Sequence, residues 1–310
     1  MCRHRRPTHG SPSPRRATAR EIYAMRPDGT GLRNLTRNAA DDRMPMWSPG
    51  RRRLAFRSNR DGEDAIYTMN TDGSSVRKPF TPPPDIGRLA WAPDGKRFAF
   101  ASKHDGSRRI YVMDSDGGRQ RRITNDVNTL AYGAAWSPDS TRVAFTSSPN
   151  GPRMIFWVAA DGRILDPTPL VVPAGVEEDP AWSPDGRRVA FLSRRRDWVR
   201  KDVWIADIGG ANARNLTLPP DGAPERDASE PAWSPDGRRV AYASWRRGIP
   251  VFNYELFVTD VANPGPAQLT EHPAHDDSPV WFDPRGLAVL PLHSRPTTWG
   301  WLRHTRGRTR

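Results

Sequence analysis

A ten-residue sequence recurs along this chain and limits its possible folds more than any other feature does. Its clearest copy, W-S-P-D-G-R-R-V-A-F, runs from Trp182 to Phe191 and places a turn between two short apolar runs. Successive copies, some of them degenerate, are 44 to 51 residues apart. This period is typical of β-propeller blades and of some helical repeats. The copies begin at Trp47, Trp91, Trp136, Trp182, Trp233 and Trp281.

A second pattern lies between successive copies and decides between these two kinds of repeat. It reads I-Y-x-M followed by Asp-Gly, as in residues 110–117, and it ends near Leu-Thr. Alternating apolar residues around a D-G turn are typical of a β-hairpin. The sequence of each unit therefore predicts four strands, the number found in a propeller blade. A Pro-Asp-Gly in nearly every unit would break helices, so helical repeats are excluded.

The two ends of the repeat array complement each other. Residues 21–36 contain only the second hairpin of a unit, and residues 279–292 contain only the first. Pairing them would complete a sixth blade and remove the sheet edges that an open array exposes. The sequence therefore predicts an all-β fold, a six-bladed β-propeller of four-stranded blades, closed by pairing the N-terminal hairpin with the C-terminal hairpin.

We interpret the repeated residues as structural. The tryptophan offers a large apolar surface that can pack between neighbouring sheets, and Asp and Gly suit tight turns. A residue repeated around a ring is more readily explained by a need of every blade than by one site. Ser140 replaces the turn glycine in the third copy, so we expect that turn to be weaker.

The formal net charge of +13 is unevenly distributed along the chain. Residues 1–20 hold six arginines, residues 294–310 hold five, and neither segment holds an acidic residue. Like-charge blocks are usually disordered, and residues 21–293 between them are nearly neutral. We predict a basic disordered arm over 1–20, a propeller over 21–293 and a basic tail over 294–310. Nucleic acid is not expected to bind the propeller, and the two basic tails are the only segments that could bind it.

Cysteine content and apolar stretches bear on the compartment. Cys2 is the only cysteine, so no intrachain disulfide and no cysteine-based metal cluster is expected. Residues 8–20 are rich in Pro, Ser and Arg and lack the apolar stretch of a secretory signal. No segment approaches the roughly 20 apolar residues of a membrane span. As written, the sequence predicts a soluble, cytoplasmic chain.

The combined motifs carry a family resemblance. P-x-W-S-P-D-G-x-R-φ-A-F, I-Y-x-M-x-x-D-G and the terminal L-T resemble the WD-like repeat of the TolB β-propeller family over nearly all of residues 21–293. The G-H and W-D dipeptides of the true WD repeat are missing at the corresponding positions. The resemblance implies a six-bladed propeller that binds proteins, like the periplasmic partner in the Tol-Pal system. It also implies a periplasmic or extracellular location, which leaves the compartment open.

Acidic segments precede several of the Trp strands, and one of them carries two histidines. Such side chains bind divalent cations, here calcium or manganese. The innermost strand of a blade lines the channel, so these residues are predicted at one channel mouth. Solvated loops, a stabilising cation site and a metal-dependent lyase or lactonase are the open interpretations. The candidate ligands are His272, His275, Asp276, Asp277, Asp42, Glu178 and Asp179.

Two long predicted loops carry tryptophan and arginine. They join the second and third strands of the fourth and fifth units, over residues 194–202 and 245–255. Trp and Arg are favoured anchors of protein interfaces, although packing of the loops on one another explains these residues equally well. The candidate partner-binding residues are Trp198, Trp245, Arg246 and Arg247.

Nucleophilic catalysis finds little support in the sequence. No G-x-S-x-G elbow is present, and the serines of the W-S-P-D-G copies lie in predicted turns without a nearby histidine. We therefore predict no catalytic residue. The sequence favours a monomeric binding or scaffold propeller that acts by protein–protein interaction, with the metal-dependent propeller enzyme as the alternative.

Overall fold

The structure of the chain is a computed structural model. It describes residues 20–293 except 50–51, 81–85, 104–105, 126–129, 149–150, 164–166, 172–174, 195–199, 218–225, 247–253, 272–275 and 282–287. The predicted arm and the predicted tail lie outside the described residues, apart from Arg20, which begins the first strand.

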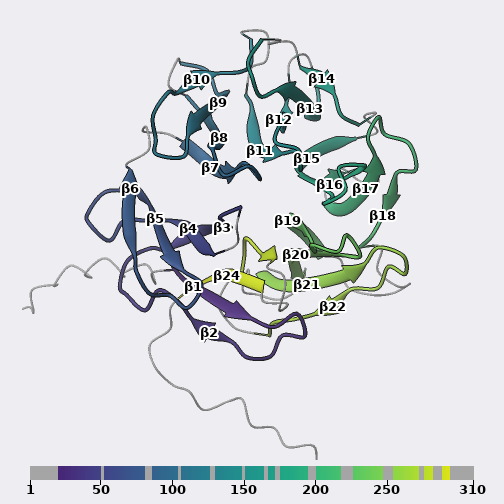
Figure 1. Ribbon diagram of the computed structural model, residues 1–310. Coiled ribbons are helices and arrows are strands. Elements are labelled where there is room, and N and C mark those ends of the chain that lie inside the picture. Colours follow the sequence, from purple (N-terminus) through teal and green to yellow (C-terminus); the bar gives the residue numbers. More distant parts are fainter. Residues whose placement is uncertain are drawn as a thin grey trace, which may run out of the picture.

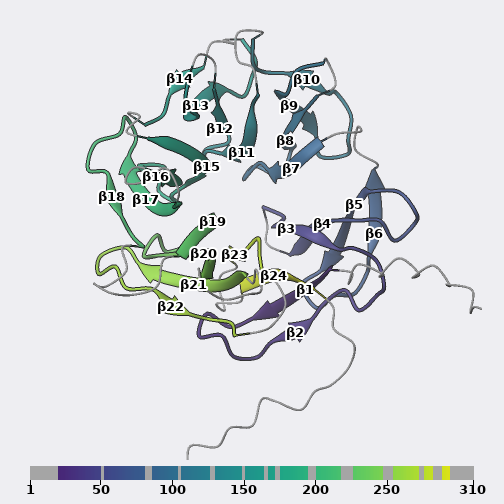
Figure 2. The ribbon, with the colours of Figure 1, turned by 180° about the vertical axis from the view of Figure 1, so that it is seen from behind.

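The described residues form six four-stranded antiparallel sheets around a central axis (Figures 1 and 2). Five sheets consist of consecutive strands and are called blades 1 to 5. Blade 1 contains β3 (Arg43–Trp47), β4 (Arg53–Ser58), β5 (Ala65–Asn70) and β6 (Arg77–Phe80). Blade 2 contains β7 (Ile86–Trp91), β8 (Arg97–Ser102), β9 (Arg109–Asp114) and β10 (Arg121–Arg122). Blade 3 contains β11 (Tyr132–Trp136), β12 (Arg142–Ser147), β13 (Met154–Ala159) and β14 (Thr168–Pro169).

The other sheets follow the same order from the axis outward, and the last one joins the two ends of the array. Blade 4 contains β15 (Val176–Trp182), β16 (Arg188–Arg194), β17 (Asp202–Asp207) and β18 (Arg214–Asn215). Blade 5 contains β19 (Arg226–Trp233), β20 (Arg239–Arg246), β21 (Tyr254–Asp260) and β22 (Ala267–Gln268). The composite sheet contains β23 (Val280–Trp281), β24 (Ala288–His293), β1 (Arg20–Met25) and β2 (Arg33–Asn34).

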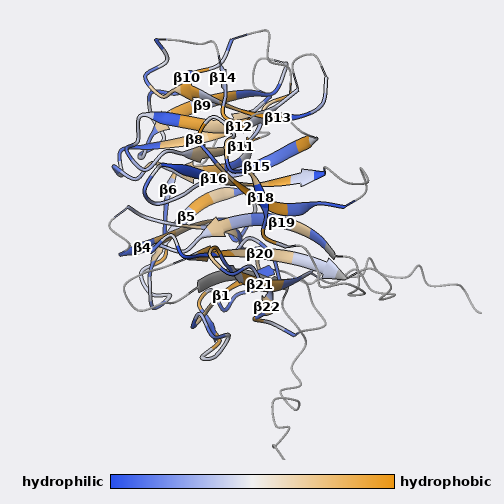
Figure 3. Cartoon of the chain, turned by 90° about the vertical axis from the view of Figure 1, so that its right-hand side faces the viewer, coloured by the Kyte–Doolittle hydropathy of each residue, from blue (hydrophilic) through white to orange (hydrophobic). Residues whose placement is uncertain are grey.

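This arrangement confirms an all-β propeller with four-stranded blades. The middle strands are apolar along their length because neighbouring blades cover both of their faces; in β8, five of six residues are buried. The outermost strands are short and exposed, and Lys78 and Pro79 lie on the longest of them, which protects the sheet edge. Figure 3 shows the apolar residues within the strands and hydrophilic residues in the connections. Nowhere in the described ranges is a helix long and apolar enough to cross a membrane.

The W-S-P-D-G turn is held by its own side chains. In blade 4, the Ser183 hydroxyl donates to Asp185 Oδ1 at 2.5 Å and accepts the N–H of Arg188 at 2.9 Å. Blades 3 and 5 repeat these bonds. Gly186 has a φ of 69°, a conformation that costs glycine little. Ser140 adopts a φ of 60° in the same place, and its hydroxyl accepts a bond from blade 2.

The predicted packing of the tryptophan between neighbouring sheets is confirmed at several interfaces. The indole Nε1–H of Trp233 in blade 5 donates to the carbonyl of Ala181 in blade 4 at 3.0 Å. The guanidinium of Arg188 lies 5.1 Å above the same ring. The repeated tryptophan and arginine therefore join one blade to the next, which supports their interpretation as structural residues.

The second hairpin motif is structural for a related reason. In three sheets the Thr of Leu-Thr accepts a bond from the backbone N–H of the third strand, as Thr217 does from Val203 at 3.0 Å, and Thr124 of Ile-Thr does so in blade 2. The D-G turn approaches the preceding sheet closely. A Cβ placed on Gly73 would lie 2.5 Å from the carbonyl oxygen of Leu35, so only glycine fits this contact.

Candidate functional site

The innermost strands share a bulge three residues before each tryptophan. Pairing with the second strand shifts register there in all five blades, and bulges re-aim side chains. Five of the six residues at this position have a positive φ, between 50° and 60°. The backbone conformation at this position therefore recurs in most sheets, whereas the side chain differs from sheet to sheet. We call these residues the bulge residues: Met44, Arg88, Gly133, Asp179, Glu230 and Ser278.

Acidic side chains gather on one side of the channel mouth. Asp179 and Glu230 come from blades 4 and 5, and Asp277 precedes β23 of the composite sheet. Burial, followed by the charge of Glu230, raises the pKa of Asp179 and raises that of Asp277 to about 6. These carboxylates are therefore close enough to repel one another.

One cation reaches this acidic group from the opposite side of the axis. Arg88 lies on β7, which faces β19 across the centre of the ring (Figure 1), and its guanidinium lies 3.5 Å from Glu230 Oε1. Burial keeps the pKa of Asp179 and of Asp277 raised, and the charge of Arg88 opposes this only in part. Lys201 acts on Asp179 and Arg20 acts on Asp277 in the same direction, yet burial and the neighbouring carboxylates still leave both pKa values raised.

The blade 3 side of the mouth is basic and aromatic instead. The ring of Tyr132 lies between two guanidinium groups, those of Arg108 at 4.9 Å and Arg153 at 5.5 Å. Arg153 is also ion-paired with Glu178, whereas Arg108 has no ion-pair partner within the described residues. The mouth is therefore polarised, with acidic bulge residues on blades 4 and 5 and with Arg108 and Arg153 around Tyr132 of blade 3.

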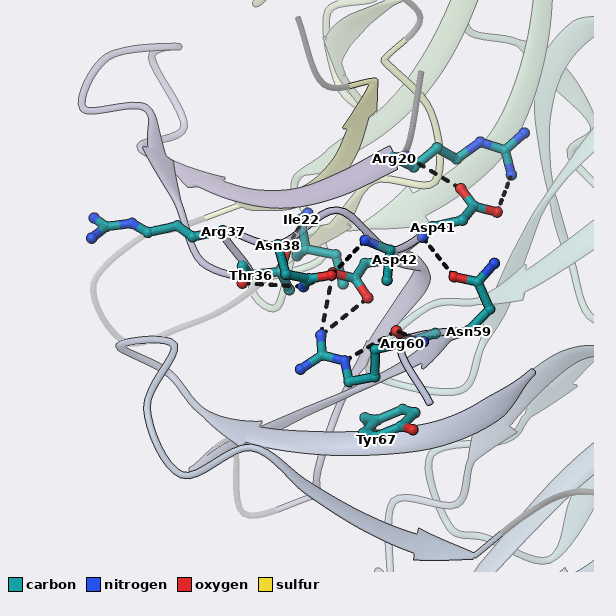
Figure 4. A network of polar contacts seen from close by, with 12 residues as sticks. Arg20, Ile22, Thr36, Arg37, Asn38, Asp41, Asp42, Asn59, Arg60 and Tyr67 are labelled. Carbon is teal, nitrogen blue, oxygen red and sulfur yellow. Dashed lines mark hydrogen bonds and ion pairs between the residues drawn. The ribbon is translucent and has the colours of Figure 1, made fainter. Parts of the chain in front are cut away.

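Asp42, a predicted cation ligand, is engaged in a structural network (Figure 4). It is completely buried. Its carboxylate pairs with Arg60 at 3.1 Å and accepts the side-chain N–H of Asn38 at 2.6 Å. The Arg60 guanidinium in turn lies 4.9 Å above the ring of Tyr67. These partners already neutralise the charge that would hold a metal.

Glu178 is similarly engaged. Its carboxylate lies 2.7 Å from Lys201 Nζ and 3.9 Å from Arg194, and it also pairs with Arg153. Burial acts to raise its pKa, but the bonds and charges of Lys201 and Arg153 outweigh burial and lower it. Three cations therefore surround this predicted ligand.

Asp276, another predicted ligand, also has a raised pKa. It is completely buried near Glu255 and Thr270. Burial, with the charges of Glu255 and Asp277, raises its pKa to about 8. His272 and His275 lie outside the described residues. Within the described part of the chain, no three His, Cys, Asp or Glu side chains are arranged to hold a metal.

The predicted partner-binding residues are described only in part. Trp198 and Arg247 lie outside the described residues. The sequence predicted Trp245 and Arg246 in a loop, and this was wrong. Both residues lie in β20, where Trp245 pairs with Asp227 and Tyr254. The Trp245–Tyr254 pair extends the hairpin, because cross-strand aromatic pairs stabilise a ladder. The loop after β20 is therefore shorter than predicted.

Comparison with known proteins agrees with this architecture. Residues 86–171 match a family model described as the TolB beta propeller domain. This chain carries a TolB-like β-propeller. Its fold is similar to that of a putative TolB from Agrobacterium tumefaciens, with a TM-score of 0.69 and 20% identity over 90% of this chain and 99% of that one.

Two further solved structures extend the comparison. TolB from Acinetobacter baumannii has a TM-score of 0.64 and 21% identity over 89% of this chain and 64% of that one. An oligogalacturonate lyase in complex with manganese has a TM-score of 0.53 and 16% identity, covering 83% of this chain and 69% of that one. At these identities the likeness concerns the fold alone.

Arg88, Arg108, Tyr132 and Arg153 were not among the residues predicted from the sequence. A usable signal exists for Arg88, because all six bulge residues lie three positions before a repeated tryptophan. Comparing these six positions in the sequence would have shown two acidic residues and one basic residue. The other three residues carry no sequence pattern that marks them.

Proposed function

We propose that this TolB-like propeller is a non-catalytic binding or scaffold module that docks a protein at its channel mouth. The polarised mouth carries the proposal, since Asp179, Glu230 and Asp277 face Arg108 and Tyr132 around a rigid ring. Charged surfaces of this kind select partners by electrostatic complementarity. The likeness in fold to TolB structures supports the same class of function.

The carboxylates of Asp179, Glu230 and Asp277 repel one another, so they favour a partner segment that carries a lysine or an arginine. Chemical crosslinking of the full chain to its partner, followed by mass spectrometry, tests this. We expect crosslinks around Glu230, and at least a tenfold loss of affinity in the double variant Glu230→Gln/Asp277→Asn. Arg187→Gln, at an exposed turn on the opposite end of a blade, is the matched control. Equal loss in both variants would overturn the proposal.

We also infer that the composite sheet acts as a sixth blade and closes the ring. The support is the ladder between β1 and β24, from Arg20 opposite His293 to Met25 opposite Ala288, and the bond from Trp281 Nε1 to the Ala232 carbonyl of blade 5 at 2.9 Å. Paired cysteines at Ala24 and Val289 should form a disulfide under mild oxidation. Failure to crosslink in a folded protein would contradict closure.

The metal-dependent lyase or lactonase is our second candidate, and the fold likeness to a lyase bound to manganese favours it. Its cation would lie beside Asp277 and Asp179, the predicted ligands that form no ion pair within the described residues. Thermal unfolding with calcium and with manganese tests the candidate. A rise in midpoint that Asp277→Asn abolishes supports it, whereas no rise with either ion rejects it.

A further inference from the structure

A cross-strand pair at the turn end of the blades differs in blade 3. In the other four blades, an arginine that begins the second strand lies opposite an Asp or Asn that ends the third. In blade 3 the arginine is Arg142, and Ala159 lies opposite it. Blade 3 thus keeps the arginine and has an alanine where the other blades have a polar residue. The four other pairs are Arg53–Asn70, Arg97–Asp114, Arg188–Asp207 and Arg239–Asp260.

The guanidinium of Arg142 is also placed differently from its counterparts. Those of Arg97, Arg188 and Arg239 lie over the tryptophan of the following sheet. That of Arg142 lies 4.5 Å above Trp157 of its own blade. Within the residues that the structure describes, the Arg142 guanidinium forms no hydrogen bond or ion pair. Its donors are therefore available to a ligand.

A pocket of about 360 Å³ lies beside this guanidinium, between the two turns of blade 3. Trp157, Ala159 and Ala160 form an apolar wall, and Asp161 lies at the edge. Arg97 also lines the pocket, but its Nη2 already donates to the Ser140 carbonyl at 2.8 Å. The volume suits a small organic molecule rather than a bare ion.

We propose that this pocket binds a small organic carboxylate. The carboxylate group binds the guanidinium of Arg142, and the apolar part of the ligand lies against Trp157. Bonds between guanidinium and carboxylate are among the strongest in proteins. The stacking of Arg142 on the indole holds its donors in position. The carboxylate comes either from a free small molecule or from the C-terminus of a peptide.

Calorimetric titration of the full chain tests the proposal with phenylacetate and with its uncharged analogue phenylacetamide. We expect phenylacetate to bind at least about tenfold more tightly, because only it bonds to the guanidinium as an anion. Arg142→Gln should lose this preference, whereas Arg188→Gln, the matched change in blade 4, should keep it. Equal affinities for the two probes, no binding of either, or equal behaviour of the two variants overturns the proposal.

A second variant does not depend on loss of function. Ala159→Asp places a negative charge in the pocket wall beside Arg142, so it should weaken phenylacetate binding by at least about tenfold through repulsion of the ligand carboxylate. Unchanged binding in this folded variant contradicts the proposal. Tripeptides ending in phenylalanine, with a free or an amidated C-terminus, distinguish the two sources. Tighter binding of the free peptide than of phenylacetate assigns the site to a peptide terminus.

Discussion

The interfaces between blades use the same repeated residues in two different ways. Between blades 4 and 5, the Trp233 indole donates to the preceding blade and Arg188 stacks on it. The interfaces between blades 2 and 3 and between blade 5 and the composite sheet are alike. Between blades 3 and 4, the buried Trp182 Nε1–H has no acceptor within the described residues, and Arg142 lies over Trp157 instead.

The difference teaches that a repeated motif does not guarantee a repeated interaction. Trp157 occupies a third-strand position where blade 2 has Val112 and blade 4 has Ile205. Its ring packs in the same cluster as Trp182, and it draws Arg142 away from the interface. One large side chain on the third strand therefore changes what two motif residues do.

The largest expected effect is a pH dependence of stability, and it comes from Asp276, between blade 5 and the composite sheet. Because its pKa is about 8 in the folded protein and about 4 in an unfolded chain, the folded state keeps a proton that the unfolded state loses between these values. The free energy of unfolding should therefore fall by a few kcal/mol as the pH rises from about 4 to about 8. Urea unfolding across this range measures it.

Asp276→Asn provides the control, since it cannot ionise. Its free energy of unfolding should fall much less over the same pH range, and the variant should be more stable than the natural chain at pH 8. Part of the fall below about pH 6 should remain, because the pKa of Asp277 is also raised to about 6. A natural chain whose stability is constant or rises with pH contradicts the prediction.

Two turn glycines test how much the close contact between the D-G turn and the preceding sheet requires glycine. Gly73 has a φ of 89° and meets the Leu35 carbonyl, whereas Gly62 has a φ of 92° and nothing nearby. Gly62→Ala should cost about 1 kcal/mol of stability through backbone strain alone. Gly73→Ala should cost about 3 kcal/mol, because backbone must also move. Equal costs in chemical denaturation would show that the close approach is unimportant.

The comparison between the two kinds of interface is sharpened by Trp→Phe changes. Trp233→Phe removes a satisfied N–H and leaves the Ala181 carbonyl without its donor, so it should cost about 1–2 kcal/mol more than Trp182→Phe. Trp182→Phe removes an N–H that lacks an acceptor. Loss of this unsatisfied group offsets part of the stability that is lost with the indole packing. Denaturant midpoints at constant slope measure both, and a reversed order would show that the two interfaces are equivalent.

The smallest expected effect concerns the two arginines. Arg188→Gln removes a stacking contact between blades and should cost about 1 kcal/mol. Arg142→Gln acts on an exposed side chain within one blade and should cost less than about 0.5 kcal/mol. Thermal unfolding of the two variants in parallel compares them. A larger loss in Arg142→Gln would mean that this residue, too, joins blades.

Most of the fold was predictable from the sequence, because a blade is local. The turn residues, the alternating apolar residues of the strands and their spacing are all present in the sequence of one unit. Four strands per unit therefore followed from the motifs around Trp182 alone. The site was less predictable. The sequence predicted the acidic segments at the mouth, but Asp42 and Glu178 pair with Arg60 and Lys201, which lie in the connections after β4 and before β17.

The sequence by itself determined blade content and phase, and it determined that Trp, Ser, Asp and Gly of the motif are structural. Only the tertiary structure decided which charges meet. Arg88 and Glu230 are far apart in the chain and become neighbours because opposite blades share one narrow axis. Arg142 acquires its role because Trp157 and Ala159 stand beside it. Periodicity is a local property, whereas the pairing of side chains across a ring depends on distances that only the closed fold defines.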